Sequence, residues 1–437
     1  MIFSDIAGEN GIFCDGDWIE KKDQDPNGEV RLIQLADIGA GEFLDKSNRF
    51  VSNATAESLN CTLLHEGDLL ISRLGEPLCK ACIFPLEGKF ITAVDVAILR
   101  INSAKVDARY LLYLINSPWF KERIKKYESG TTRKRISRKN LDRVEMQFPT
   151  VSEQRRIVSR IEELFSELDN SVSTLQKTKE QLAVYRQAVL KEAFEGKFSL
   201  IWRKENPNES GFRDYDSISL KNVCFKDISG DENELKLEIP KTWRKTRLGE
   251  VFKVEVGGTP KRAKPEYWNG GIHWVSSGEV HFNRICETEE TISEDGLAHT
   301  STAIHKPGTV MLAMIGEGKT RGQAAILDVP AAHNQNTAAI LVSETLCEPL
   351  FVYYFLLLTY DHTRRVGSGN NQKALNKERV KALRMPLPSF KEQKIIVSEI
   401  ESRLSVCDSI EQTVDTALQQ AEAMRQSILK QAFEGRL

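Results

Sequence analysis

The sequence lacks the features of a membrane or secreted protein. No apolar run of about 18 residues, the length that spans a bilayer, occurs in its 437 residues. The first 17 residues hold four acidic residues and no lysine or arginine, unlike a secretory signal peptide. We therefore expect no membrane partner and a cytoplasmic location.

Cysteine and histidine are few and poorly arranged for holding a metal. Among the eight cysteines there is one CxxC pair, Cys79 and Cys82, and no second pair or nearby histidine completes a zinc site. The seven histidines lack metal-ligand spacing, apart from a weak match at His299 and His305. We expect reduced thiols, mostly buried as small apolar groups, and no metal centre.

Catalytic signatures are missing as well. The chain has no amino-methyltransferase Asn-Pro-Pro-aromatic motif, no GxGxxG opening a helix, and no HExxH or GxSxG. Residues 313–320 fit a relaxed phosphate-loop pattern, but the short apolar run that follows ends at Pro330, which leaves no room for the helix that receives the phosphates. The aligned stretch of the first half has no Gly-Lys-Thr. We predict a hairpin loop there, and neither enzymatic activity nor a cofactor bound by this chain.

Neither positive nor negative charge dominates, since 60 Lys and Arg balance 62 Asp and Glu for a net charge of −2. This excludes a histone-like polybasic protein, although a local basic face remains compatible with nucleic-acid binding. A content of 28% charged and 41% hydrophobic residues is that of an ordinary globular protein. The length predicts about two to four domains.

What the chain does have is an internal repeat. Residues 153–198 and 392–437 are identical at 19 of 46 positions without gaps, at an offset of 239 residues. Neither copy contains proline, and glycine occurs only at Gly196 and Gly435, where the end of a helix favours it. Each copy therefore predicts one helix, roughly 60 Å long at about 1.5 Å per residue.

Apolar residues recur every seven positions in both copies, which indicates a coiled coil. The predicted seam consists of Ile161, Leu168, Leu175, Leu182 and Val189 in the first copy and Ile400, Cys407, Val414, Ala421 and Ile428 in the second. Companion seam positions are Ile157, Leu164, Tyr185, Ile396, Ile410, Ala417 and Met424. Because an isolated helix cannot bury such a seam, we expect the two copies to pack on each other as an antiparallel pair. Packing of each helix on its own domain, or homodimerisation, are the alternatives.

The repeat extends upstream of the helices. Ser129-Gly130 matches Ser368-Gly369 at the same offset, and residues 67–72 and 97–99 align with residues 308–313 and 339–341. Short apolar runs broken by Gly, Pro, Asn and Asp predict a curled, mostly antiparallel sheet in each half. The expected fold class is α+β: two α/β domains separated by a long antiparallel two-helix coiled coil, with a pseudo-twofold internal repeat.

The predicted order is domain, helix, domain, helix. The boundaries are residues 1–152 for the first domain, 153–198 for the first helical region, 199–239 for a linker, 240–391 for the second domain and 392–437 for the second helical region. The lead into the second domain, residues 240–252, has only a shortened counterpart at residues 1–6. The start of the first domain is therefore the least certain part of the repeat.

Basic segments occur at matched places in the two halves. Residues 121–143 carry a net charge of +7 and residues 360–382 a net charge of +4, each with a glycine-bearing loop ahead of a short helix. Lys and Arg neutralise phosphates, and Arg, Asn and Gln bond to base edges. A solvated charged face is the alternative interpretation. The candidate DNA-binding residues are Arg73, Lys126, Thr131, Thr132, Arg133, Lys134, Arg135, Arg138, Lys139, Lys319, Arg321, Arg364, Asn370, Asn371, Gln372, Lys373 and Lys377.

These motifs together resemble the specificity subunits of type I restriction-modification systems. The resemblance covers essentially the whole chain, and its strings are the duplicated Glu-Gln and Ala-Phe-Glu-Gly ends of the helices, residues 186–190 with their echo at 425–429, residues 202–207, and Gly257-Gly258-Thr259-Pro260 with Tyr267-Trp268. It implies a non-catalytic DNA reader, whose two target-recognition domains each read half of an asymmetric bipartite site. The helices would then set the gap between the halves.

The resemblance also implies the partners. Two methyltransferase subunits would dock on the helices, and restriction and translocase subunits would join them. S-adenosylmethionine, ATP and Mg²⁺ would be bound by those subunits, where adenine methylation and DNA cleavage would take place. Two other hypotheses stay open: a self-sufficient methyltransferase or nuclease, and a coiled-coil adaptor without a role on DNA.

Overall fold

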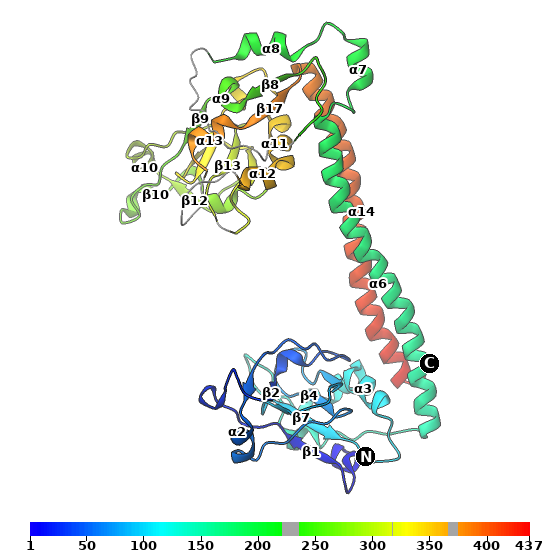
Figure 1. The fold of residues 1–437 in the computed structure, drawn as a ribbon. Coiled ribbons are helices and arrows are strands. Elements are labelled where there is room, and N and C mark those ends of the chain that lie inside the picture. Colours follow the sequence, from blue (N-terminus) through cyan, green and yellow to red (C-terminus); the bar gives the residue numbers. More distant parts are fainter. Residues whose placement is uncertain (221–235, 317, 366–374) are drawn as a thin grey trace. The chain divides into compact units, whose positions relative to one another are not determined.

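The computed structural model describes residues 1–220, 236–316, 318–365 and 375–437 (Figure 1). The chain forms two compact units, one of Met1–Lys177 with Val414–Leu437 and one of Thr178–Thr413. Each unit contains one globular domain and part of both long helices, α6 (Val151–Phe194) and α14 (Phe390–Phe433). No helix in the described ranges is long and apolar enough to cross a membrane.

The first domain is built around two sheets. The strands of the antiparallel four-stranded sheet are, in spatial order, β1 (Ile12–Asp15), β7 (Val96–Arg100), β4 (Leu69–Ser72) and β5 (Ala81–Ile83). Those of the smaller sheet are β3 (Phe50–Val51), β2 (Val30–Ile33) and β6 (Phe90–Thr92), with β2 and β6 parallel. The helices are α1 (Phe3–Ala7), α2 (Asn53–Ser58), α3 (Ala108–Asn116), α4 (Pro118–Ile124) and α5 (Arg138–Leu141).

Strand β4 is buried on both faces, which is why its sequence is a continuous apolar run. Successive side chains of a strand point to opposite faces of the sheet. Leu69 and Ile71 accordingly join the core formed with α3, α4 and the start of α6, whereas Leu70 joins a second core with Phe84 and Ile98. The four-stranded sheet thus separates two cores within one domain.

The second domain repeats this plan. Its larger sheet holds β11 (Asn283–Ile285), β14 (Ala324–Leu327), β13 (Val310–Ala313), β16 (Thr337–Ile340) and β9 (Val254–Val256). A three-stranded sheet holds β12 (Glu290–Ile292), β10 (Trp268–Val275) and β15 (Ala331–His333), and a two-stranded one holds β17 (Arg384–Leu387) and β8 (Arg244–Arg247). Its helices are α9 (Leu248–Val251), α10 (Glu294–Ala298), α11 (Pro349–Leu358), α12 (Tyr360–Arg365) and α13 (Lys377–Ala382).

The two domains share strand register as well as strand order. Leu69 of β4 pairs with Leu99 of β7, and Val310 of β13 pairs with Ile340 of β16, so both pairs are separated by the same offset. The parallel pair β2 and β6 is matched by the parallel pair β10 and β15. The predicted duplication is therefore confirmed at the level of backbone pairing.

The first residues of the first domain make a contact that recurs in the second domain. The backbones of Met1 and Met146 exchange two hydrogen bonds, of 2.8 and 2.9 Å. At the equivalent place in the second domain Thr246 of β8 faces Met385 of β17. The pair of Met1 and Met146 thus matches one residue pair of the β8–β17 ladder.

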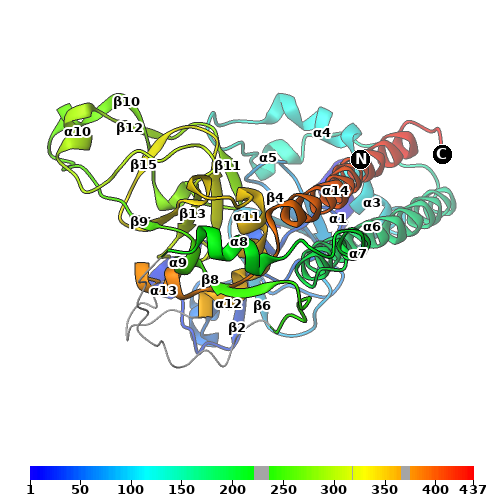
Figure 2. The same cartoon turned by 90° about the horizontal axis from the view of Figure 1, so that it is seen from above.

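Helices α6 and α14 lie side by side in both views (Figure 1, Figure 2). In the first unit Asp169 of α6 forms an ion pair with Arg425 of α14. In the second unit Arg186 of α6 binds Asp408 at 2.7 Å and Glu411 at 2.8 Å on α14. Residues further along α6 pair with residues that come earlier in α14. The two helices are therefore antiparallel, and they pair within one chain, as predicted.

Most residues of the predicted seam are buried. Seven of its ten residues are buried and three are half-buried: Leu168, Leu175 and Ile428. Three companion positions were predicted wrongly, because Tyr185, Ile410 and Met424 are exposed by 40% or more. A pair of helices buries only the narrow stripe between them, so residues at the edge of that stripe face solvent unless another element covers them.

The predicted linker contains ordered structure that its composition did not suggest. Residues 199–220 include α7 (Leu200–Glu205) and α8 (Gly211–Ile218). Arg203 and Ser199 bind the buried Glu392 at the start of α14, with distances of 2.5 Å and 2.8 Å to its Oε1. Asp214 accepts the backbone N–H of Phe390 at 2.7 Å. The segment therefore covers the first turn of α14.

Strand β13 is followed by the antiparallel strand β14 and not by a helix, so the two strands form the predicted hairpin, with residues 314–316 and 318–323 between them. Gly322 N donates to Ala313 O at 2.8 Å beside that loop.

The CxxC pair of the first domain is buried, and burial raises the pKa of both the Cys79 and the Cys82 thiol to about 12. Neither thiol is available as a thiolate at neutral pH.

Candidate nucleic-acid interface

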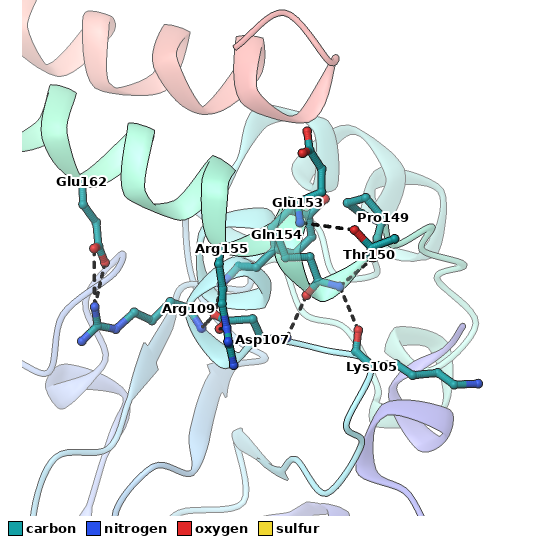
Figure 3. A network of polar contacts seen from close by, with 10 residues as sticks. Lys105, Asp107, Arg109, Pro149, Thr150, Glu153, Gln154, Arg155 and Glu162 are labelled. Atoms are coloured by element: carbon teal, nitrogen blue, oxygen red, sulfur yellow. Dashed lines mark hydrogen bonds and ion pairs between the residues drawn. The ribbon is translucent and has the colours of Figure 1, made fainter.

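The glutamine of the first Glu-Gln pair joins the long helix to its domain. Gln154 is fully buried near the start of α6 (Figure 3). Its Oε1 accepts the backbone N–H of Asp107 at 2.8 Å, and its Nε2 donates to the carbonyls of Lys105 at 2.8 Å and Pro149 at 2.9 Å. One side chain therefore binds both the turn before α3 and the turn before α6.

Two weaker ion pairs lie near Gln154, at the surface of the domain. Arg109 reaches Glu162 at 3.2 Å, and Arg155 lies 3.8 Å from Asp107 (Figure 3). Asp107 also caps α3 by accepting the backbone N–H of Arg109 at 3.0 Å. These ion pairs are solvent-exposed, so each contributes little compared with the buried amide.

The second Glu-Gln pair forms the same joint. Gln393 is buried, accepts the backbone N–H of Glu348 at 2.9 Å and donates to the carbonyl of Pro388 at 3.1 Å. Glu348 precedes α11 as Asp107 precedes α3. The duplicated glutamine therefore fixes each domain to the first turn of the helix that follows it.

The basic segment of the first domain forms a closed hairpin at the surface. Ser129 and Arg135 exchange two backbone hydrogen bonds, of 2.9 and 2.8 Å, and all five residues from 131 to 135 are exposed. Gly130 has a φ of +91°, and a Cβ there would lie 2.3 Å from the carbonyl oxygen of Arg133. The loop therefore requires glycine at this position.

The hairpin places candidate residues together on one exposed loop. Lys134 lies 3.5 Å from Glu76 and 3.6 Å from Glu128. Arg133 and Arg135 have no acidic partner within the described ranges, which leaves both guanidinium groups free for an anionic ligand. Thr131 and Thr132 add hydroxyl groups next to them. Lys126 and Lys139 are also exposed, near the two ends of the hairpin in sequence.

Two candidate arginines bind Asp15, and one of them, Arg73, is buried whereas Arg138 is half-exposed. Arg73 is 7% exposed, donates to the carbonyls of Val94 and Ile136, and lies 3.1 Å from Asp15. Arg138 binds the other oxygen of Asp15 at 3.4 Å. The prediction that Arg73 contacts DNA is corrected, because its guanidinium holds together three segments and cannot reach the surface. Sequence alone could not distinguish a buried arginine from a surface one.

The second domain brings three of its candidates together. Lys319 is exposed in the loop between β13 and β14, and Arg321 donates to the carbonyl of Arg364 on α12 at 2.8 Å. Arg364 in turn binds Gly318 O and the hydroxyl of Tyr360. Lys377 is exposed at the start of α13. Asn370, Asn371, Gln372 and Lys373 lie outside the described residues.

A buried histidine pair lies below the turn between β15 and β16. His305 and His333 are joined through their Nε2 atoms at 3.2 Å, and Nδ1 of His333 lies 2.8 Å from the hydroxyl of Thr337. Burial, and then the neighbouring His305, lower the pKa of His333 to about 3. Both rings are therefore neutral at pH 7, and they form a hydrogen-bonded chain that supports this turn.

The sequence prediction missed that turn, Asn334-Gln335-Asn336, as a surface feature. Its signal was available, because three adjacent amide residues separate the apolar runs of β15 and β16. Gln335 is exposed at its tip, whereas Asn334 is buried. The first domain has no amide at the matching residues 93–95, so the repeat comparison gave no reason to select it.

Comparison with known proteins gives one consistent family. The family model described as the type I restriction modification DNA specificity domain matches residues 12–182 and 240–420. The chain is 25% identical over 349 residues to the EcoBI specificity subunit of Escherichia coli, covering 78% of this chain and 68% of that protein. It is 23% identical over 387 residues to the MjaVIII specificity subunit of Methanocaldococcus jannaschii, covering 86% of this chain and 80% of that protein.

Solved structures share the fold. A chain from a study of complex assembly and conformational transition of the type I R-M system matches with a TM-score of 0.70 at 16% identity, covering 100% of this chain and 97% of that one. The HsdS subunit from Thermoanaerobacter tengcongensis matches with a TM-score of 0.52 at 16% identity, covering 94% and 92%.

Proposed function

Because this chain belongs to the type I restriction modification DNA specificity family, we propose that it is the DNA-recognition subunit of a type I restriction-modification complex. The observation that carries the proposal is a duplicated domain whose scaffold is repeated and whose exposed residues differ. Gln154 and Gln393 make the same joint, yet the exposed loop of the first domain carries Arg133 and Arg135 where the second domain differs in sequence. One scaffold with two surfaces suits the reading of two unlike half-sites.

Each domain then reads one half of an asymmetric bipartite site. Phosphate contacts come from exposed cations such as Arg133, Lys134 and Lys319, which supply affinity and orientation without sequence information. Residues with amide and hydroxyl groups on the same loops supply base contacts. The antiparallel helices set the number of unspecified base pairs between the half-sites.

The chain is non-catalytic in this proposal, and its partners perform the chemistry. Two methyltransferase subunits, which bind S-adenosylmethionine, dock on the helices, and restriction and translocase subunits supply ATP- and Mg²⁺-dependent cleavage. Support comes from four exposed apolar residues on the helices of the second unit, Val184, Tyr185, Val406 and Ile410. These side chains are available for an apolar contact with a docking subunit. The complex acts on chromosomal DNA, and therefore in the cytoplasm.

The helix-spacer relation can be tested by removing one heptad from both helices. The register of Asp169 with Arg425 and of Arg186 with Asp408 pairs residues 171–177 with residues 417–423. Deleting both segments shortens the pair by about 10 Å, or about three base pairs of B-form DNA. We expect the preferred spacer to shorten by that amount while both half-sites stay unchanged.

The matched control deletes residues 171–177 only. It leaves the pairing out of register, so we expect loss of specific binding and not a new spacer. An unchanged spacer after the double deletion would contradict the proposed role of the helices.

Two further assays separate the other function classes. Purified chain incubated with S-adenosylmethionine and DNA should transfer no methyl group; methylation without a partner subunit would identify a self-sufficient enzyme. DNA binding measured at two salt concentrations should weaken steeply with salt, because phosphate contacts release counterions. A chain that binds no DNA even together with its methyltransferase partners would instead be an adaptor.

A further inference from the structure

Two loops of the second domain meet where β9 ends and β15 ends. Strand β9 is followed by Gly257-Gly258-Thr259-Pro260, and Gly258 N donates to the carbonyl of His333 at 2.9 Å. A Cβ at Gly257 would lie 1.9 Å from that carbonyl oxygen, and one at Gly258 would lie 2.8 Å from Ser301 Oγ. Gly257 is therefore needed for this close approach, which brings Thr259 beside the turn at residues 334–336.

The close approach of these two loops orients the exposed side-chain amide of Gln335. Thr259 Oγ1 donates to Gln335 Oε1 at 2.5 Å. A carbonyl oxygen has two lone pairs, so Oε1 still accepts one more hydrogen bond, and Nε2 keeps its two N–H donors. Gln335 thus presents an acceptor and a donor side by side, in a direction fixed by Thr259.

The backbone that carries Gln335 is held by buried neighbours. Asn334 Oδ1 accepts the N–H of Asn336 at 3.0 Å, and the hydroxyl of Thr337 donates to Asn334 O at 3.1 Å. Thr337 is fully buried and is bound in turn to His333. A rigid turn lowers the entropy lost when its side chain binds a ligand.

The turn lies next to the basic segments to which phosphate contacts were assigned above. Met314 N donates to Asn336 O, and Leu375 N donates to Met314 O, both at 2.9 Å. Met314 directly follows β13, and the loop that carries Lys319 begins there. The backbone of Met314 therefore joins the two features: it bonds to the turn that carries Gln335, and it begins the loop that carries Lys319.

The first domain has different side chains at the same two positions. The bond from Asp17 N to Thr92 O, 2.7 Å, corresponds to the bond from Gly258 N to His333 O. Trp18 therefore matches Thr259, and Val94 matches Gln335. Trp18 is 70% exposed, and no amide is present at this place in the first domain. At these equivalent positions beside the basic loops, the second domain therefore has polar side chains and the first domain has apolar ones.

We propose that Gln335, oriented by Thr259, is a specificity-determining residue that reads an adenine in the half-site of the second domain. The geometry fits, because a side-chain amide bonds in bidentate fashion to N6 and N7 of adenine in the major groove. The exposed ring of Trp18, with Val94, makes the matching position of the first domain apolar, which suits the methyl group of thymine. This inference rests on the proposed function.

The test selects bound DNA from a randomised duplex library, using the full chain with its methyltransferase partners, and sequences the bound fraction. Gln335→Leu should lower the preference for adenine at one position of one half-site by about 5- to 150-fold, the range of one bidentate contact. Gln335→Glu should move that preference toward cytosine, whose N4 amino group a carboxylate accepts. Thr259→Val should weaken the adenine preference without replacing it.

Two controls make the outcomes distinct. Lys319→Ala should weaken binding to all sequences alike, and Gln419→Leu, at an exposed position of α14, should change no base preference. If Gln335→Leu and Gln335→Glu both bind DNA with every base preference unchanged, the role of Gln335 is refuted while the proposed function stands. If the unaltered chain selects no sequence at all, the proposed function fails, and this inference fails with it.

Discussion

Replacement of Gln154 by leucine tests how each domain is fixed to its helix. The amide of Gln154 is fully buried and makes three hydrogen bonds of 2.8, 2.8 and 2.9 Å to main-chain groups. Leucine is of similar size but leaves the N–H of Asp107 and the carbonyls of Lys105 and Pro149 without this partner. An unsatisfied buried polar group costs about 1–3 kcal/mol, so the joint should lose roughly 3 kcal/mol once some relaxation is allowed.

Hydrogen exchange measures this loss locally, which avoids assuming that a two-unit chain unfolds in one step. A loss of roughly 3 kcal/mol corresponds to about 100-fold faster exchange of the amides around residues 105–107 and 150–154. Gln393→Leu should produce a smaller change of the same kind at Glu348 and its neighbours, since two of the three main-chain bonds recur in the second joint. The matched control is Gln187→Leu, because that glutamine is exposed on α6.

Gln187→Leu should change stability by no more than about 0.5 kcal/mol, as is usual for an exposed substitution. If Gln154→Leu leaves exchange at the joint as slow as Gln187→Leu does, the buried amide does not hold domain and helix together. An effect in the first unit with none for Gln393→Leu would refute the equivalence of the two joints.

Three other predictions concern charge. The pKa of His333 lies at about 3, below the unfolded value of about 6.5, so the folded second domain binds no proton at this ring. The contribution of His333 to stability is therefore present above pH 6.5 and should fall by about 2 kcal/mol at pH 5, measured by hydrogen exchange of the amides of β15 and β16. His333→Gln should flatten this pH dependence. Arg186→Ala removes two partly exposed ion pairs between α6 and α14 and should cost about 0.5–1 kcal/mol, with a double-mutant cycle against Asp408→Ala as the check. Arg133→Ala combined with Arg135→Ala should reduce the slope of log K against log salt by about 2; an unchanged slope would place the hairpin away from DNA.

The long helices were predictable because their signal is repeated many times along the chain. A heptad pattern fixes which face is buried, so residues such as Leu182 and Val414 could be assigned to the buried face from the sequence alone. The edge positions could not, because exposure there depends on whether a third element covers the pair. Tyr185 and Ile410 are exposed since nothing in the part of the chain that the structure describes covers them.

The candidate site was predictable to the extent that its residues are close in sequence. The hairpin at residues 129–135 follows from a local charge run with a glycine. Arg73 was misplaced because its partners, Asp15 and Ile136, are distant in the chain and only the fold brings them together. The pairing of Thr259 with Gln335 escaped prediction for the same reason.

The central claim is that two unlike readers, fixed to one pair of helices, recognise one divided DNA sequence. Methylation-sensitive sequencing of genomic DNA modified by the assembled complex tests it most directly. We expect a split motif, with two defined half-sites separated by a gap of fixed length and adenine methylated on both strands. Methylation at a continuous motif, or at half-sites with a variable gap, would contradict the account.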